Sequence, residues 1–403
     1  MIFALIVTFL LFTGTRFQLG SFSVCGTEIG LFIFTAHFLW KRNLQNLDLS
    51  VLELFIFFLL LAISLLSAAI SPGHHYVNYL SDVRNFLFPL VFFLIVHRHL
   101  TFDEAHPYII SIISVGTALA IYGILQATIM PLLPLEQNAQ TTEFFQYKSS
   151  FVRNSFESTF KIIRFPIAFC DNPHDFTANL IFPSSLALLF AVFNPHKHKI
   201  GIFYIISFVI TFFCILIGLQ RSAALTTIGS LIFYVFFFLQ NNLLRLIVII
   251  LCGLCLPLIS IFDWDGGGTL NGRFEANLAF IDFSIEKPQR LFLGGEKFLF
   301  AEKNLMLPHM FPLYLCLTFG IFGGIIATAF ILFLLLKKIQ PECNTFSFNN
   351  NAIHSTCLSV LFIYAMQTSF FDVATNAGMF FFVLTLAFSK KSTKLTQGQY
   401  HAS

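Results

Sequence analysis

Long runs of apolar residues, separated by shorter polar connections, recur along almost the whole chain. A helix needs roughly 20 mainly apolar residues to cross a bilayer core about 30 Å thick, and many runs reach or approach this length. The pattern therefore predicts an all-α, polytopic transmembrane bundle of about twelve helices. The runs lie at 2–15, 24–40, 51–70, 83–97, 108–130, 176–194, 200–218, 223–240, 244–262, 310–336, 353–370 and 374–389.

Two segments, 131–175 and 263–309, are too polar to be spans and predict large loops on one side of the membrane. Loops of this length are usually functional or disordered. The sequence thus predicts helices 1 to 5 in 1–130, a loop in 131–175, helices 6 to 9 in 176–262, a large loop in 263–309, helices 10 to 12 in 310–390 and a tail in 391–403.

The second loop has a helical pattern of its own. Apolar residues recur in it at i, i+4, i+7 and i+11, as on one face of an α-helix. These residues are Phe274, Leu278, Ile281 and Ile285. They predict an amphipathic helix that lies on the membrane surface.

Composition and charge agree with a membrane protein and orient it. Hydrophobic residues make up 57% of the chain, charged residues only 11%, and the mean hydropathy is +0.80. The net charge of +3 and the lack of dense Lys/Arg runs give no reason to expect nucleic acid as a partner. If both termini are cytoplasmic, the short outside connections hold only Arg16, Arg84 and Arg221, whereas the inside connections are rich in Lys and Arg. The positive-inside rule then predicts that both large loops are periplasmic.

Arginines on that outer side are the first candidates for chemistry. Arg221 ends the apolar run FFCILIGLQR, at a tight outside turn before the next span. Arginine offers a planar fork of donors that matches phosphate oxygens and keeps its charge. Each of these residues taken alone is as readily a surface charge or a snorkelling side chain. The candidates for a diphosphate site are Arg221, Arg290 and Arg273, with Arg153 and Arg164 as possible additions.

His309 stands between Pro308 and Pro312, where a long apolar run begins. The prolines restrict the backbone, so that the histidine would be held at the outer end of a span. A near-neutral pKa suits imidazole to remove a proton from a hydroxyl group. The plainer interpretation is a histidine that favours the headgroup region of the membrane.

Metal chemistry has less support in the sequence. Asp263 and Asp265 form a D-x-D that could hold a divalent cation, but three glycines follow and a flexible turn explains them equally well. Cys252 and Cys255 form a CxxC inside an apolar run with no histidine nearby. We therefore expect neither a metal nor another cofactor.

In the order of these features the chain resembles the bacterial O-antigen ligase and O-antigen polymerase superfamily. The shared features are Arg221-Ser222 at the outer turn, Arg290 before LFLGG in the late loop, His309, a span containing GIFGG, and RFPIAFCDNPHDFTANLI before the middle spans. The resemblance implies metal-independent, inverting glycosyl transfer from an undecaprenyl-diphosphate-linked glycan at the periplasmic face. It also implies that Arg221 and a loop arginine, Arg290 or Arg273, bind the diphosphate and that His309 orients or deprotonates the acceptor hydroxyl. Met310 stands where the family often has Asn.

Two questions stay open at this point. The acceptor could be lipid A-core, as in a ligase, which the late loop, Arg221 and His309 favour slightly, or a second lipid-linked glycan, as in a polymerase. A lipid-linked oligosaccharide flippase or another exporter is the alternative of a different class. The absence of an internal repeat counts against it. So does the expected place of ionisable residues such as His354 and Arg84 near span ends. The expected location is a bacterial inner membrane, with both termini cytoplasmic and the active site periplasmic.

Overall fold

The computed structural model shows a mostly helical protein. It describes residues 1–14, 16–19, 22–42, 50–70, 75–128, 168–170, 173–193, 198–218, 220–238, 277–282, 294, 310–336, 345–365, 371 and 373–390. Its elements are α1 (Ile2–Leu11), β1 (Arg16–Leu19), β2 (Phe22–Cys25), α2 (Gly26–Lys41), α3 (Val51–Ile70), α4 (His75–Val96), α5 (Phe102–Thr128), α8 (Pro173–Phe193), α9 (His198–Ile217), α10 (Arg221–Phe238), α14 (Phe311–Leu336), α15 (Thr345–Ser359), the π-helix η5 (Val360–Tyr364) and α16 (Ala374–Ala387).

Five of the described helices, α3, α4, α5, α8 and α14, are long and apolar enough to cross a membrane. Eleven of the predicted apolar runs overlap a described helix. The run at 244–262 lies outside the described residues, so the count of twelve helices stays a prediction. The all-α class and its compatibility with a membrane are thus supported.

The helices form a bundle with two distinct ends. The Arg84 end is defined by the contacts of Arg84 with Glu28 and of Asn376 with Asp175. The Arg98 end is defined by the contacts of Arg98 with Glu53 and of Ser389 with Asn350. Phe3 contacts His37 near the end of α2, and Lys390 bonds to Leu100 before α5, so the first helix starts and the last helix finishes at the Arg98 end.

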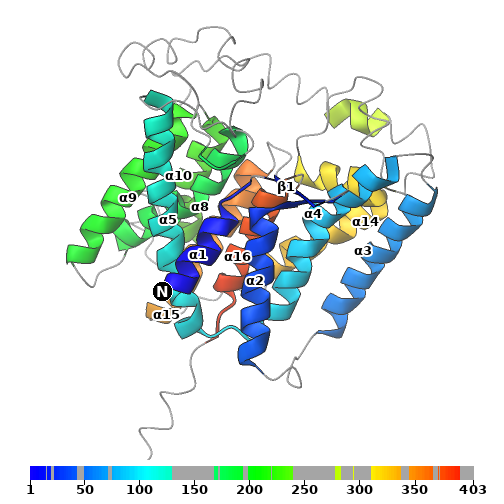
Figure 1. Ribbon diagram of the computed structural model, residues 1–403, viewed down its shortest axis with the longest axis horizontal. Helices are drawn as coiled ribbons and strands as arrows, with labels where there is room; N and C mark the ends of the chain where they lie inside the picture. Colours follow the sequence, from blue (N-terminus) through cyan, green and yellow to red (C-terminus); the bar gives the residue numbers. More distant parts are fainter. Residues whose placement is uncertain are drawn as a thin grey trace, which may run out of the picture.

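The helices fall into two lateral groups around α16. Figure 1 shows α5, α8, α9 and α10 on one side and α3, α4 and α14 on the other. The sequence of α16, ATNAGMFFFVLTLA, is buried along its whole length, because α4, α2, α15 and α8 all pack around it. Burial on every side is typical of a central helix.

A small β-hairpin, which the sequence pattern did not predict, precedes α2. β1 and β2 pair antiparallel, with Arg16 opposite Cys25. The carboxylate of Glu28, three residues into α2, accepts a hydrogen bond from the backbone N–H of Cys25 at 2.9 Å. This bond satisfies a free donor at the start of the helix and fixes the Glu28 side chain at the Arg84 end.

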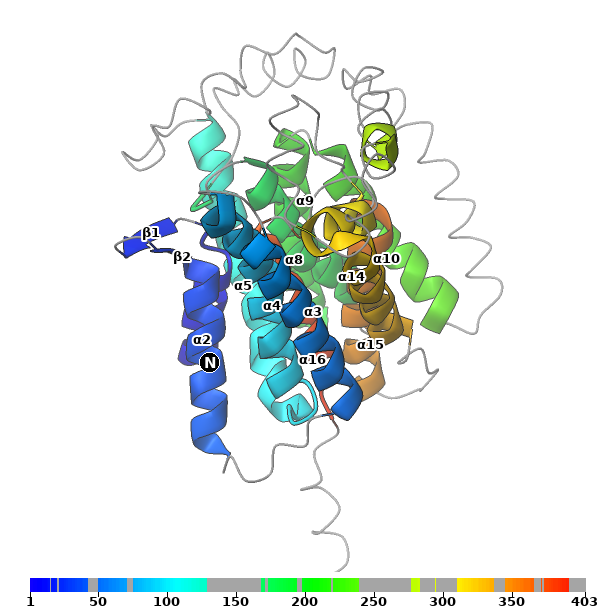
Figure 2. The same cartoon turned by 90° about the vertical axis from the view of Figure 1, so that its right-hand side faces the viewer.

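The predicted span at 310–336 is helical, as α14, but it is bent. Gly320 has φ 74° and ψ 163°, which breaks α14 into two helical pieces, and Figure 2 shows the change of direction. A Cβ on Gly324 would lie 2.4 Å from the Cα of Cys316, so the two pieces touch. The positive φ and the close approach both require glycine. The GIFGG segment is thus the bend itself.

Several helices, among them α4, α8 and α15, begin earlier than the apolar runs predicted. α4 begins at His75 rather than at 83, so Arg84 lies inside a helix and not in a connection. α8 begins at Pro173 rather than at 176, which brings Asp175 into its first turn. α15 begins at Thr345 rather than at 353, so His354 is a buried residue well inside the helix and not near its end.

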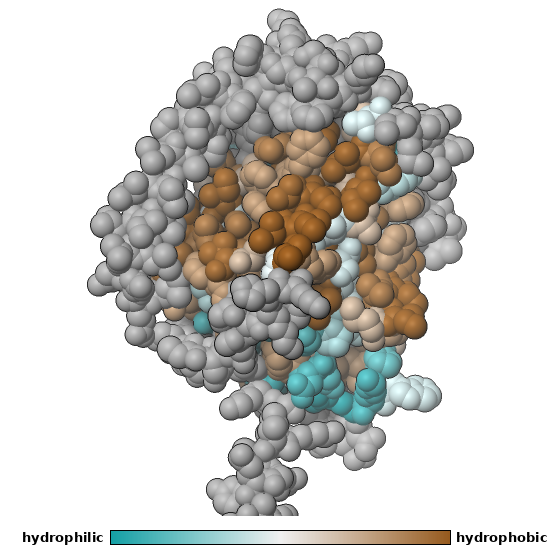
Figure 3. All heavy atoms as spheres, turned by 90° about the vertical axis from the view of Figure 1, so that its left-hand side faces the viewer, coloured by the Kyte–Doolittle hydropathy of each residue, from teal (hydrophilic) through white to brown (hydrophobic). Residues whose placement is uncertain are grey.

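Apolar side chains cover part of the outside of the bundle, as expected for a lipid-facing surface. Figure 3 shows hydrophobic residues gathered over the middle of one face, with hydrophilic ones below them. Large exposed apolar residues lie along α3 and α9, including Val51, Phe55, Ile202 and Val209. These faces have no covering element among the described parts of the chain.

Candidate functional site

The residues predicted for catalysis and diphosphate binding lie mostly outside the described residues. His309, Arg290, Arg273, Arg153 and Arg164 all do. For Arg221 the structure gives the backbone, as the first residue of α10. For His309 and Arg290, the nearest described residues in the chain are Met310 and Gly294.

The beginnings of α10 and α14 lie at the same end of the bundle, the Arg84 end. α10 runs antiparallel to α15, because the Ser355 and Ser359 hydroxyls donate to the Ser230 and Thr226 carbonyls. η5 continues from Ser359 to Ala365, whose carbonyl accepts a hydrogen bond from the Phe311 N–H at 2.8 Å. Arg221 precedes Thr226 in α10 by about one and a half helical turns, roughly 8 Å at 1.5 Å per residue. It therefore lies further toward the Arg84 end than Thr226 does.

The start of α10 at Arg221 and the start of α14, two residues after His309 in the sequence, are therefore brought to one end of the bundle by hydrogen bonds among α10, α15, η5 and α14. His309 itself lies outside the described residues.

A cluster of buried aromatic rings supports the first piece of α14. The Phe371 ring contacts those of Phe86, Phe311 and Phe380, with centroids 5.8, 5.8 and 5.4 Å apart. Phe86 also meets Phe319 edge to face at 5.5 Å. The rings join α4, α14 and α16, and close packing of this kind resists movement. They hold the start of α14 firmly in the bundle.

Gly294 pins the late loop to the bundle. Its N–H donates to the Ser67 hydroxyl of α3 at 2.9 Å, and it is buried against α14. Gly294 is the first glycine of LFLGG, four residues after Arg290.

Gly294→Ala is expected to lower the free energy of unfolding by about 1 to 3 kcal/mol, the usual range for overpacking. The added Cβ would lie 1.9 Å from the Thr318 carbonyl oxygen and 2.8 Å from the Phe319 nitrogen, and backbone atoms cannot turn away. Thermal unfolding in detergent measures the loss. Gly201→Ala is the matched control, because a Cβ there meets nothing within 4 Å. Equal melting temperatures for the two variants would contradict the placement of Gly294.

Part of the predicted amphipathic helix is described, at 277–282, and it is helical. Phe280 is the residue that packs on the protein, against Leu317 of α14. Leu278 and Ile281, from the predicted apolar stripe, are exposed instead. This segment therefore packs on α14 through Phe280, a ring that the periodicity did not mark, and its two described stripe residues, Leu278 and Ile281, are available to lipid.

Arg84 forms an ion pair inside the bundle that sequence reasoning missed. Its Nε lies 2.9 Å from Glu28 Oε1, and the Glu28 side chain is 8% exposed. The two residues lie on α2 and α4, which α3 separates in the chain, and no local sequence pattern links them. Pairing with Arg84, which is 32% exposed, compensates the buried Glu28 carboxylate in a mainly apolar bundle.

A second missed polar contact joins α8 to α16 at the same end. The Asn376 amide donates to Asp175 Oδ1 at 3.3 Å, and both side chains are buried. A Cβ on Gly218, at the end of α9, would lie 2.5 Å from the Thr177 side chain, so the turn that leads to Arg221 packs on the first turns of α8. Asp175 belongs to the PHDFTANLI stretch, but the sequence placed it in a loop.

The Arg84 end thus gathers a buried carboxylate with its amide partner, the first residue of α10, and the described residues that flank Arg290 and His309. Such an end can hold an anionic headgroup if the nearby arginine side chains face it. Among the described residues, no group of three or more His, Cys, Asp or Glu side chains is arranged to hold a metal ion. The sequence matched no family model and no curated protein, and the fold matched no solved structure.

Proposed function

We propose that the protein is a membrane glycosyltransferase of the O-antigen ligase type. It would transfer an undecaprenyl-diphosphate-linked glycan to a hydroxyl of a lipid A-core acceptor at the periplasmic face of a bacterial inner membrane. The proposal rests on the resemblance of the sequence in its motifs, together with a mostly helical fold in which five described helices are able to span a bilayer.

One structural observation carries the proposal. The start of α10 at Arg221 and the start of α14, two residues after His309, lie at the same end of the bundle. Transfer from a lipid diphosphate needs cationic donors and a proton acceptor around one headgroup. Had these two starts lain at opposite ends, no shared site could form.

The orientation in this proposal follows from charge. The Arg98 end carries Lys41, Arg42, Arg98 and Lys390. The positive-inside rule assigns such an end to the cytoplasm, which makes the Arg84 end periplasmic. The diphosphate would then sit at the outer membrane surface while its polyprenyl tail stays in lipid.

In the proposed reaction the acceptor oxygen attacks the anomeric carbon from the side opposite the diphosphate. The new C–O bond forms as the bond between that carbon and the diphosphate oxygen breaks, so the configuration inverts. His309 takes the hydroxyl proton. Arg221, with Arg290 or Arg273, stabilises the negative charge that grows on the leaving diphosphate. Arg153 and Arg164 are further candidates for that role. No metal or cofactor is assigned to the step.

Complementation of a ligase-null strain tests the proposal, with the lipopolysaccharide ladder as the readout. We expect the parent chain to restore capped lipopolysaccharide and Arg221→Ala and His309→Ala to fail. Arg42→Gln and His37→Ala are controls at the Arg98 end and should restore it. Membrane abundance of each variant is measured beside the ladder. Rescue by both site variants would refute the catalytic assignment.

The same experiment separates the alternatives. Rescue of a polymerase-null strain instead would show that the acceptor is a second lipid-linked glycan. Rescue of a flippase-null strain alone would favour export. The buried His354 in the interior of α15 is the observation that keeps export in the comparison, because ionisable residues inside spans often serve transport.

A further inference from the structure

We propose that Arg84 binds the phosphate headgroup of a lipid, at the Arg84 end of the contact between α2 and α4. The site consists of the Arg84 guanidinium, the Glu28 carboxylate that holds it, and the exposed ring of Phe32 one helical turn away. It does not depend on the proposed glycosyl transfer, so the two can be tested separately.

Glu28 holds the guanidinium with one oxygen only. Its Oε2 accepts a hydrogen bond from the Cys25 N–H at 2.9 Å, at the start of α2. Its Oε1 is left for Arg84, whose Nε lies 2.9 Å away. The Arg84 Nε is buried, and its N–H is not aligned with that oxygen as a hydrogen bond requires, so the contact is a pair of charges. Glu28 therefore fixes the inner part of the guanidinium and leaves its outer part without a carboxylate.

The ion pair at the Arg98 end is built differently. Glu53 engages Arg98 through both oxygens, Oε1 with Nη2 at 3.0 Å and Oε2 with Nε at 3.2 Å. In this two-point pairing a carboxylate occupies one whole edge of a guanidinium. Glu28 cannot do the same, because its second oxygen is engaged with Cys25. Both Nη groups of Arg84 therefore stay as donors that have no acceptor among the described residues.

The remaining donors lie where lipid headgroups are found. The Arg84 side chain is 32% exposed although its Nε is buried, so the exposure belongs to its other atoms. Glu28 is in the first turn of α2, directly after the β-hairpin, which lies at this end of the helix (Figure 2). Basic residues between membrane helices bind anionic headgroups, and the planar fork of guanidinium donors fits phosphate oxygens.

An exposed aromatic ring lies where the chain of such a lipid would follow. α2 and α4 run in the same direction, since the Phe34 and Phe92 rings, further along both helices, have centroids 5.6 Å apart. Phe32 follows Glu28 by one turn on the same face of α2 and is 66% exposed. A phosphate at Arg84 thus has apolar surface beside it in the direction of the bundle centre. A soluble anion would gain nothing from that ring.

Binding of dioleoyl phosphatidic acid to the full-length protein in neutral detergent tests the site, with bound lipids counted by native mass spectrometry. Glu28→Gln combined with Arg84→Gln removes both charges together, so that no buried carboxylate is left unpaired. We expect this charge-free variant to bind the tightest lipid about ten- to a hundredfold more weakly, as for loss of charge-assisted hydrogen bonds. Glu53→Gln combined with Arg98→Gln is the matched control at the other end and should leave this affinity unchanged.

Two further comparisons identify the source of the phosphate. Phe32→Ser keeps both charges and should lower the affinity for phosphatidic acid about three- to tenfold, because apolar contact is lost. Trp40→Ser should not, although Trp40 is 91% exposed on the same helix, since it lies near the Arg98 end. Dioleoylglycerol, which lacks the phosphate, and inorganic phosphate, which lacks the chains, should each bind at least about tenfold more weakly than phosphatidic acid.

Equal affinity of the parent and the charge-free variant for phosphatidic acid would overturn the site, and so would equal affinity of the parent for dioleoylglycerol. Inorganic phosphate bound as tightly as the lipid, with no effect of Phe32→Ser, would overturn the assignment to a lipid. Thermal unfolding shows whether each variant is folded. Because Phe32→Ser retains the ion pair, its result decides the case even if the charge-free variant folds poorly.

Discussion

Replacement of His309 by Gln is expected to lower kcat for glycosyl transfer by about 10² to 10⁴, the usual contribution of a general base. Gln keeps a hydrogen-bonding side chain but cannot accept the proton that leaves the acceptor hydroxyl. KM for the lipid-linked donor should change by no more than a few-fold, because in the proposed site the arginines, not the imidazole, bind the diphosphate. Initial rates against donor concentration in detergent give both constants.

The structure supplies the control for this experiment. His37→Gln changes a histidine of α2 near the Arg98 end, where the ring contacts Phe3, and it should leave kcat unchanged. A loss of activity in His309→Gln that appeared only as a higher KM would assign the residue to substrate binding. Full activity in that variant would remove the imidazole from the reaction.

Hydropathy located the helices because burial in lipid depends on the average character of about twenty residues. It could not locate the bend in α14. Gly320 lies inside one continuous apolar run, and only the contact between Cys316 and Gly324 shows that the chain folds back there. Nor could hydropathy find the polar first turns of α15. Asn350 is buried there because its side chain bonds to Ser389, a residue 39 positions away.

The candidate site was predicted from arginines and one histidine that stand out in an apolar sequence. That contrast marks single residues, and it cannot show which charges meet. The partners of Arg84 and Asp175 come from other helices, so neither Glu28 nor Asn376 could be paired with them from sequence. The turn signal of LGS at residues 19–21, flanked by strand-forming residues, could have revealed the β-hairpin beside Glu28.

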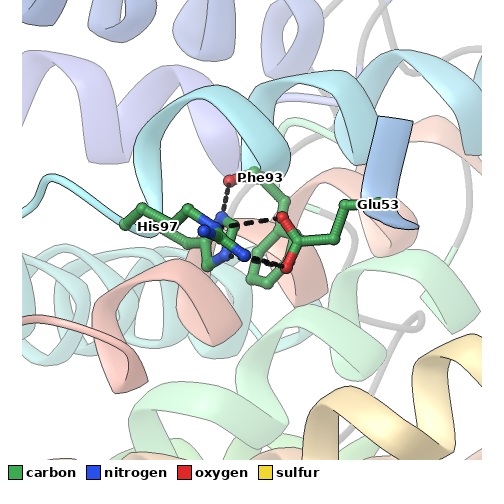
Figure 4. A network of polar contacts seen from close by, with 4 residues as sticks. Glu53, Phe93 and His97 are labelled. Atoms are coloured by element: carbon green, nitrogen blue, oxygen red, sulfur yellow. Dashed lines mark hydrogen bonds and ion pairs between the residues drawn. The ribbon is translucent and has the colours of Figure 1, made fainter. Parts of the chain in front are cut away.

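Replacement of Glu53 by Gln is expected to destabilise the protein by about 3 kcal/mol. Glu53 Oε1 and Oε2 accept hydrogen bonds from Arg98 at 3.0 and 3.2 Å, and the His97 ring lies 3.6 Å away (Figure 4). The His97 ring is itself held by a 2.8 Å contact of Nδ1 with the Phe93 carbonyl oxygen. Removal of one member of a buried ion pair costs about 3 to 5 kcal/mol, because the other charge stays buried without compensation. Arg98 is 25% exposed, which favours the lower value.

The same substitution at Glu104 gives a matched control. Glu104 pairs with Arg42, but both side chains are about one third exposed, at 35% and 33%. Water screens such a pair, so Glu104→Gln should cost less than about 1 kcal/mol. Gln can also keep the hydrogen bonds that Glu104 accepts from Thr101 at the start of α5. Thermal unfolding in detergent should therefore separate the two variants clearly.

A charge-free variant distinguishes loss of the ion pair from loss of packing. Glu53→Leu combined with Arg98→Leu removes both charges, and apolar replacements of buried pairs are often neutral or stabilising. We expect its melting temperature to lie near that of the parent and above that of Glu53→Gln. A double variant as unstable as the single one would show that the side-chain shapes, not the unpaired charge, determine the cost. Because the network lies at the Arg98 end, kcat of the folded fraction should be unchanged in every variant of this set.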